Sequence, residues 1–168
     1  MKEAIFPGSF DPFTLGHLNV LESALTLFDK VTIAIGKNST KKGLFDINER
    51  LEIINESISQ LKAQGKQIDV CVYEGMTAEL CKQTNINFLV RGLRVSSDFE
   101  FENVIAQANQ KINPNVSTIF IPASGEYAFI SSTVVRDVLH SGGDAKIFMA
   151  PGVDIRKYFN KKIVQKHD

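Results

Sequence analysis

The sequence has few cysteines, no excess of either charge and no long apolar run. Cys71 and Cys81 lie in apolar periodic segments and lack the spacing of metal ligands, so we expect reduced core thiols and a cytoplasmic location. No stretch of 18 apolar residues and no signal pattern at the N-terminus occur, so we expect no membrane association. Because 19 basic residues match 19 acidic ones, no overall field attracts the chain to nucleic acid or to anionic lipid.

Several catalytic and cofactor motifs are also missing. The turn after the first apolar segment is neither G-x-G-x-x-G nor G-x-x-x-x-G-K-[ST], which argues against a dinucleotide dehydrogenase and a P-loop NTPase. The sequence has no G-x-S-x-G nucleophile turn, no Ser-His-Asp arrangement and no credible metal cluster. A set of cations and hydroxyls without a covalent nucleophile remains, which suits direct in-line transfer at phosphorus.

What the sequence does contain is an alternation of short apolar segments and helical patterns. Buried strands are expected at residues 3–6, 31–35, 67–73, 87–90 and 116–121. Helices are expected from residue 16, after a capping box at Asp46 and Glu49, at 77–83, at 99–112 and from about 131, with a C-terminal helical tail from about 153. This alternation predicts that residues 1–168 form a single domain with a doubly wound, Rossmann-like α/β fold. In such a fold, helices cover both faces of a five-stranded parallel sheet.

The first strand leads into a turn and a helix that begins near His17. Free N–H groups and the positive dipole end of a helix bind anions at such a junction, so we expect a phosphate site there. The local pattern equally allows an ordinary turn in which His17 only caps the helix. In a doubly wound sheet, ligands bind at the carboxyl ends of the strands. Each segment expected there carries donors, which favours a polyanionic ligand: Ser9, Thr14 and His17; Lys41 and Lys42; Thr77; Arg91 and Arg94; Ser131, Ser132, Thr133 and Arg136.

Several of these donors, and three further candidate residues, also have a structural interpretation. Lys41 could be solvated in a loop, Ser131-Ser132-Thr133 could be a plain helix cap, and Glu102 could lie on an exposed helix face. Tyr127 and Phe129 could belong to the core or contact an adenine ring.

Two short segments resemble known signatures. Thr14-Leu15-Gly16-His17 resembles the T-x-G-H form of the nucleotidyltransferase superfamily signature, and Ile130-Ser131-Ser132-Thr133 resembles its second signature. The wider combination resembles the bacterial phosphopantetheine adenylyltransferase family, from the first strand to about residue 150. It is carried by residues 7–12, 91–94, 98–102 and 129–132.

The resemblance implies a role for each matching position. His17 would stabilise the transition state at the α-phosphate, together with Ser9 and Lys41. The positions implied for ATP are Ser9, Phe10, His17, Gly92, Leu93, Arg94, Glu102, Tyr127, Ala128, Phe129, Ile130, Ser131, Ser132 and Thr133. The positions implied for the second substrate are Ser9, Lys41, Thr77 and Arg91. Tyr127 stands where many members carry tryptophan, and Thr77 where an apolar residue is more usual.

The resemblance also implies the reaction and its partners. ATP and 4'-phosphopantetheine would give 3'-dephospho-CoA and pyrophosphate, a step of coenzyme A biosynthesis. Mg²⁺ would be carried by ATP rather than by protein side chains, coenzyme A would act as feedback inhibitor, and the protein would form a homohexamer.

Other readings stay open at this point. One is a sister enzyme that adenylylates nicotinamide mononucleotide or cytidylylates a phosphoalcohol. Another is a non-catalytic adenine-nucleotide sensor on the same fold. An aminoacyl-tRNA synthetase shares the first signature, but 168 residues leave no room for a tRNA-binding domain.

Overall fold

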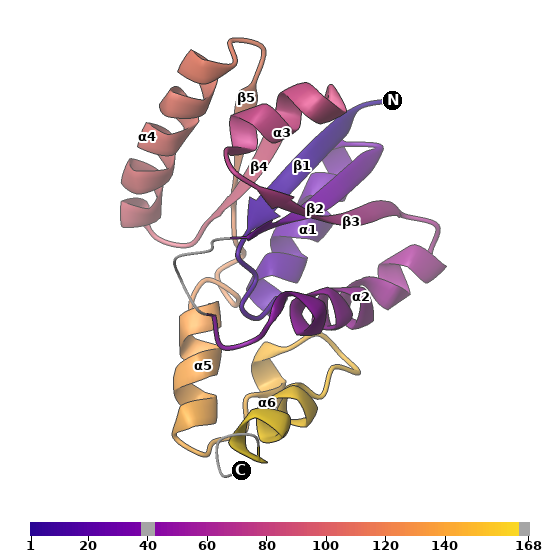
Figure 1. Cartoon of the computed structure of the whole chain (residues 1–168), viewed down its shortest axis with the longest axis vertical. Coiled ribbons are helices and arrows are strands. Elements are labelled where there is room, and N and C mark those ends of the chain that lie inside the picture. The colour runs from indigo at the N-terminus through magenta and orange to yellow at the C-terminus, as the bar shows by residue number, and fades with distance from the viewer. Residues whose placement is uncertain (38–42, 165–168) are drawn as a thin grey trace.

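The computed structural model describes residues 1–37 and 43–164. Within these residues, five parallel strands form one sheet in the order β3-β2-β1-β4-β5 (Figure 1). The strands are β1 (Glu3–Gly8), β2 (Lys30–Lys37), β3 (Gln67–Glu74), β4 (Phe88–Leu93) and β5 (Ser117–Pro122). The chain builds outward from β1 to β3 and then returns to add β4 on the other side of β1. The strand order therefore reverses between β1 and β4, where ligands bind in such sheets.

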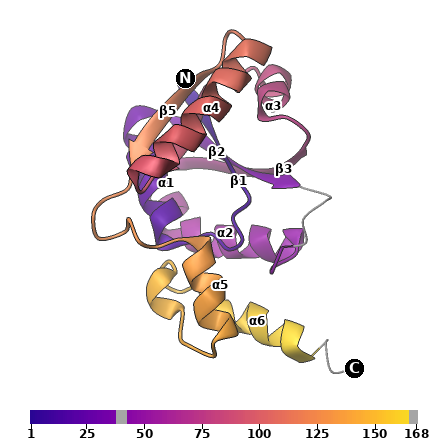
Figure 2. The ribbon, with the colours of Figure 1, turned by 90° about the vertical axis from the view of Figure 1, so that its left-hand side faces the viewer.

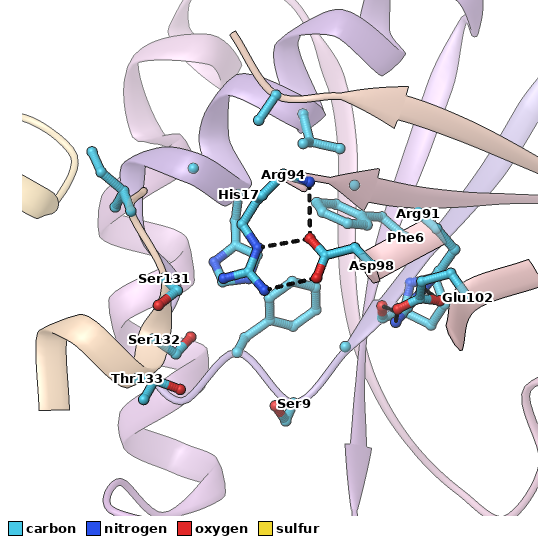
Figure 3. A pocket seen from close by; sticks show the side chains of 18 of the residues that line it. Phe6, Ser9, His17, Arg91, Arg94, Asp98, Glu102, Ser131, Ser132 and Thr133 are labelled. Carbon is cyan, nitrogen blue, oxygen red and sulfur yellow. Dashed lines mark hydrogen bonds and ion pairs between the residues drawn. The ribbon is translucent and has the colours of Figure 1, made fainter. Parts of the chain in front are cut away.

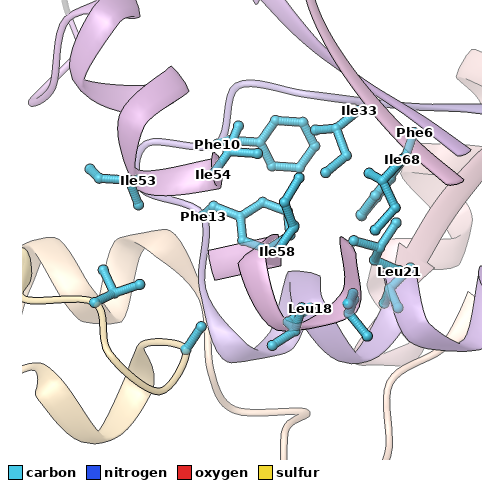
Figure 4. Packing of buried hydrophobic residues seen from close by; sticks show 14 of the residues in the cluster. Phe6, Phe10, Phe13, Leu18, Leu21, Ile33, Ile53, Ile54, Ile58 and Ile68 are labelled. Carbon is cyan, nitrogen blue, oxygen red and sulfur yellow. The ribbon is translucent and has the colours of Figure 1, made fainter. Parts of the chain in front are cut away.

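Helices cover both faces of this sheet, as the sequence predicts (Figure 2). The helices are α1 (Leu15–Leu27), α2 (Ile47–Ala63), α3 (Thr77–Thr84), α4 (Ser96–Ile112), α5 (Ser132–His140) and α6 (Ile155–Val164), with a short 3₁₀ helix, η1 (Lys146–Phe148). Successive strand side chains point to opposite faces. Phe6 accordingly packs with Leu21 of α1 and Ile54 of α2 in the larger core (Figure 4), whereas Ile5 packs with Leu80 of α3 on the other face.

The predicted capping box at the start of α2 is confirmed. The backbone N–H of Glu49 donates to the Asp46 carboxylate at 2.9 Å, and the N–H of Asp46 donates to the Glu49 carboxylate at 2.9 Å. Ser131 likewise caps α5, since its Oγ accepts from the N–H of Val134 at 3.2 Å. Two of the expected helix starts are therefore fixed by local side-chain chemistry.

The expected end of the fourth strand is wrong. The sequence pattern places Arg91-Gly92-Leu93 after a strand that ends at residue 90, but the structure includes all three in β4. They continue the ladder with β5, where Arg91 lies opposite Phe120 and Gly92 opposite Ile121. Pairing with a neighbouring strand overrides the local signal of a charged residue followed by glycine.

The last helix, α6, packs beneath α2 at the far end from the sheet (Figure 1). Tyr158 of α6 is fully buried, and its hydroxyl donates to the Glu56 carboxylate of α2 at 2.8 Å. Among the helices the structure describes, none has the length and apolar character needed to cross a membrane.

Candidate active site

A cleft of about 300 Å³ lies at the carboxyl ends of β1 and β4, where the strand order reverses (Figure 3). Side chains from the first turn, from β4, from α4 and from the start of α5 line it. The sequence-predicted residues that line it are Ser9, Phe10, His17, Arg91, Gly92, Arg94, Glu102, Ile130, Ser131, Ser132 and Thr133. The fold thus brings together residues that are up to 124 positions apart in the chain, counting from Ser9 to Thr133.

The imidazole of His17 is held in one orientation at the start of α1. The backbone N–H of Thr14 donates to His17 Nδ1 at 3.0 Å, and Thr14 Oγ1 lies 3.0 Å from the same nitrogen. Because Nδ1 accepts a hydrogen bond, the neutral ring carries its proton on Nε2. Burial lowers the pKa of His17 most, and the positive charges of Arg94 and Arg91 lower it further, to about 4 in total. The ring of His17 is therefore neutral at pH 7, with its proton on Nε2.

The turn between β1 and α1 has an unusual backbone conformation. Phe10 adopts a left-handed φ of 47°, although its side chain is only 2% exposed. Its ring packs edge-on against His17, with centroids 5.2 Å apart. A Cβ at Gly8 would lie 2.8 Å from the Phe10 ring, so only glycine fits before this turn. The turn leaves Ser9 exposed at the mouth of the cleft.

Two arginine–carboxylate pairs form the wall opposite the turn. Arg91 Nε donates to the Glu102 carboxylate at 2.7 Å, and Arg94 Nε donates to the Asp98 carboxylate at 3.1 Å. Partial burial raises the pKa of Asp98, but the Arg94 N–H and guanidinium lower it more, and the net shift is downward. The two carboxylates thus fix the orientation of their arginines in the wall of the cleft, as Figure 3 shows for Arg94 and Asp98.

The N-terminus of α5 closes the cleft on the side of α1. Ser132 Oγ donates to the Pro12 carbonyl at 2.8 Å, which ties α5 to the first turn. A Cβ at Gly16 would lie 2.7 Å from the Ile130 carbonyl oxygen, so glycine lets α1 approach this segment closely. The starts of two helices thus converge on one cleft, and each presents backbone N–H groups and the positive end of its dipole.

Some sequence-predicted residues do not line the cleft. Four of them adjoin lining residues in the chain without lining the cleft themselves: Leu93, Tyr127, Ala128 and Phe129. The Phe129 side chain is 62% exposed. Thr77 lies at the start of α3, where its Oγ1 is 2.8 Å from the Tyr73 hydroxyl. Lys41 and Lys42 lie outside the described residues, so the prediction for Lys41 stays a prediction.

Asp98 lines the cleft but was not among the predicted site residues. Arg136, one of the donors expected at this edge of the sheet, lines it as well. In the sequence, Asp98 could be an ordinary helix cap, and its spacing of four residues from Arg94 is the local signal that could have revealed the pair. Arg136 Nη1 donates to the Asp11 carbonyl at 2.6 Å. That contact spans 125 residues of chain, so no local pattern could reveal it.

A neutral histidine, two oriented arginines and two helix starts at a strand-order reversal form a cleft suited to binding phosphate groups. A family model described as cytidylyltransferase-like matches residues 5–138, and the chain belongs to that family of nucleotidyltransferases. A protein of Christiangramia forsetii is 47% identical over 94% of this chain and 99% of its own length. One of Flavobacterium psychrophilum is 41% identical over 93% of this chain and 100% of its own. Both are phosphopantetheine adenylyltransferases, and the chain belongs to the phosphopantetheine adenylyltransferase family.

A solved structure supports the fold independently. It is a bifunctional NMN adenylyltransferase/ADP ribose pyrophosphatase from Francisella tularensis, which matches with a TM-score of 0.69 and 18% identity. The match covers 97% of this chain and 50% of that one. At this identity the likeness shows the shared fold alone. The much higher identity to the adenylyltransferases of phosphopantetheine favours their activity over that of a nicotinamide mononucleotide enzyme.

Proposed function

We propose that this protein transfers the adenylyl group of ATP reversibly to 4'-phosphopantetheine, which gives 3'-dephospho-CoA and pyrophosphate. Family membership supports this substrate pair. The observation that carries the chemistry is His17, whose pKa is lowered to about 4 and whose Nδ1 is already occupied by the Thr14 N–H. Its Nε2–H can therefore donate to a charged phosphate oxygen without giving up the proton.

The phosphate of phosphopantetheine attacks the α-phosphorus of ATP in line, and the bond to the leaving pyrophosphate breaks. No general base is needed, because the attacking phosphate oxygen is already ionised. His17 and the Ser9 hydroxyl stabilise the charge that develops on the transferring group, and the helix starts behind them add their dipoles. Lys41 shares this role as a prediction from the sequence.

The two arginines divide the substrates between them in this proposal. Arg94, Glu102, the Gly92-Leu93 backbone, Phe10 and residues 127–133 bind ATP. Arg91, Ser9, Lys41 and Thr77 bind phosphopantetheine. The bidentate contact of Arg91 with Glu102 fixes the guanidinium plane beside β1, where Arg91 also donates to the Pro7 carbonyl.

Magnesium enters this proposal as part of the nucleotide substrate. The carboxylates that line the cleft, Asp98 and Glu102, are each engaged by an arginine at 3.1 and 2.7 Å. They do not form an open set of oxygen ligands, so we expect phosphate oxygens and water to hold the ion.

A pyrophosphate-release assay with ATP and 4'-phosphopantetheine tests the proposal. We expect turnover by the unchanged protein and a fall in kcat of about a hundredfold or more in His17→Ala, the loss typical of one such donor. ATP binding should change much less. His140→Ala is the matched control, since His140 is exposed at the end of α5 and contacts Phe159.

The same assay separates the alternatives. Turnover with nicotinamide mononucleotide but not with phosphopantetheine would overturn the substrate assignment. ATP binding without pyrophosphate release for any phosphorylated acceptor would indicate a nucleotide sensor. An unchanged kcat in His17→Ala would remove His17 from the mechanism.

We extend the proposal to assembly and regulation on the family resemblance. The protein would form a homohexamer in the cytoplasm. Coenzyme A would inhibit it by occupying the phosphopantetheine site. Phe101 and Val104 on α4 are 68% and 66% exposed, which supports burial of this helix face against another copy. Inhibition by coenzyme A that is competitive with phosphopantetheine would support the regulatory part.

A further inference from the structure

A buried ion pair lies directly behind the first turn of the active site. Arg50 of α2 is 8% exposed and Asp11 of the turn is 7% exposed, and Arg50 Nε lies 3.4 Å from Asp11 Oδ1. Removing two charges from water is costly, and a buried pair is weak evidence for stability. Neither residue lines the cleft, and the hydrogen bonds of the pair are made with backbone groups.

The pair connects the turn to the segment that precedes α2. Arg50 Nη1 donates to the Ser9 carbonyl at 3.0 Å, and Arg50 Nε donates to the Phe45 carbonyl at 2.8 Å. The Asp11 carboxylate accepts from the backbone N–H groups of Leu44 and Phe45, both at 2.8 Å. The guanidinium and the carboxylate thus connect the turn after β1 with the backbone of the segment before α2.

The backbone between Ser9 and Asp11 needs such support. Phe10 lies between them with a left-handed φ of 47°, a backbone conformation that is unfavourable for a bulky residue. Arg50 holds the carbonyl of the peptide unit that enters Phe10, and Asp11 is held on the other side. The Phe10 ring in turn packs against His17 at 5.2 Å. Release of this backbone would therefore move both Ser9 and the surface against which His17 rests.

We infer that Arg50, together with Asp11, is a positioning residue for the transfer reaction, acting through the conformation of Phe10 on Ser9 and His17. The inference rests on the proposed function for its kinetic consequence, but its structural consequence is independent of that function.

Gly43 offers a second way to displace the guanidinium. A Cβ at Gly43 would lie 1.6 Å from Arg50 Nη2 and 2.9 Å from Asp11 Oδ2. Gly43 does not have a left-handed φ, so alanine there causes no backbone strain of its own. Gly43→Ala therefore moves the Arg50 guanidinium while both charges stay in the protein. Lysine at position 50 lacks the Nη2 atom and would relieve this clash.

The test compares Arg50→Lys, Gly43→Ala and the double variant by steady-state kinetics. We expect kcat to fall about tenfold to a hundredfold in each single variant, as for small misplacements of catalytic groups, with KM for ATP changed less than about threefold. The double variant should match Arg50→Lys instead of showing the product of the two losses. Arg156→Lys is the control, since Arg156 is exposed and also donates to a backbone carbonyl, that of Gly143, at 3.0 Å.

A readout without substrate keeps this inference separate from the proposed function. The imidazole resonances of His17, observed by NMR, should shift in Arg50→Lys and Gly43→Ala, whereas those of His140 should not. If the unchanged protein shows no turnover, the proposed function fails while the NMR result still decides the positioning role. Unchanged His17 resonances, or variants that lose thermal stability but keep kcat, would overturn the inference.

Discussion

At the scale of single residues, the environment of His17 decides its chemistry. Its ring lies among Phe6, Phe10 and Phe13, with centroids 6.4, 5.2 and 5.4 Å away. Burial of this kind disfavours the imidazolium, and the nearby arginines disfavour it further. The sequence predicts a phosphate role for His17, and the fold adds that its ring is neutral at pH 7.

The lowered pKa of His17 predicts a pH dependence of stability. Its value is about 4 in the folded protein and 6.5 for the ordinary group, so the unfolded chain binds more protons between these limits. The free energy of unfolding therefore falls as the pH falls through this window, by up to about 3 kcal/mol from this group alone. Urea denaturation at about pH 7, 5.5 and 4.5 should show a steeper loss for the unchanged protein than for His17→Asn. Parallel losses in both proteins would contradict the assignment.

At the scale of elements, local signals predicted helix starts better than strand ends. Asp46 and Ser131 cap their helices as expected, because capping depends on residues three positions apart. The end of β4 depends on its partner strand, and Arg91 stays in the ladder opposite Phe120. The predicted helical tail is present as α6, but its contact with α2 could not be read from the sequence.

The attachment of α6 to α2 predicts unequal effects of two substitutions at one carboxylate. Tyr158 and Lys157 both contact Glu56, at 2.8 and 3.2 Å, but Tyr158 is 0% exposed. Burial raises the pKa of the Tyr158 hydroxyl, and Glu56 raises it further, so the group stays protonated and donates. Tyr158→Phe should lower the free energy of unfolding by about 1–2 kcal/mol.

The control for this prediction is Lys157→Met, measured by the same chemical denaturation. The Lys157 side chain is 50% exposed in its ion pair with Glu56. Exposed pairs contribute about 0–1 kcal/mol, so this variant should lose less stability than Tyr158→Phe. Equal losses would show that the buried hydrogen bond does not anchor α6.

At the scale of the whole molecule, a chain with no net charge gathers arginines at one edge of its sheet. Arg91, Arg94 and Arg136 all line the cleft between β1, β4 and α5. The composition shows only that the net charge of the chain is zero. The alternation of strands and helices predicts the gathering, because parallel strands bring their carboxyl ends to one edge.

The exposed face of α4 gives the proposed assembly a testable interface. No residue of this helix is buried within the described part of a single chain. If copies pack through this face, Phe101→Glu should place charge in an apolar interface and yield smaller species in light scattering coupled to size exclusion. Ile147→Glu is the control, since Ile147 is 73% exposed on η1. An unchanged mass for Phe101→Glu would exclude this face from the assembly.

The sequence by itself determined the alternation of strands and helices, the capped helix starts and the T-x-G-H turn. These features rest on periodicity and on contacts between near neighbours, which a linear pattern records. The tertiary structure alone decided the neutral state of His17, the contact of Arg136 with the Asp11 carbonyl and that of Arg50 with the Ser9 carbonyl. Burial, desolvation and hydrogen bonds across tens of residues decide such features, and they exist only once distant segments have packed together.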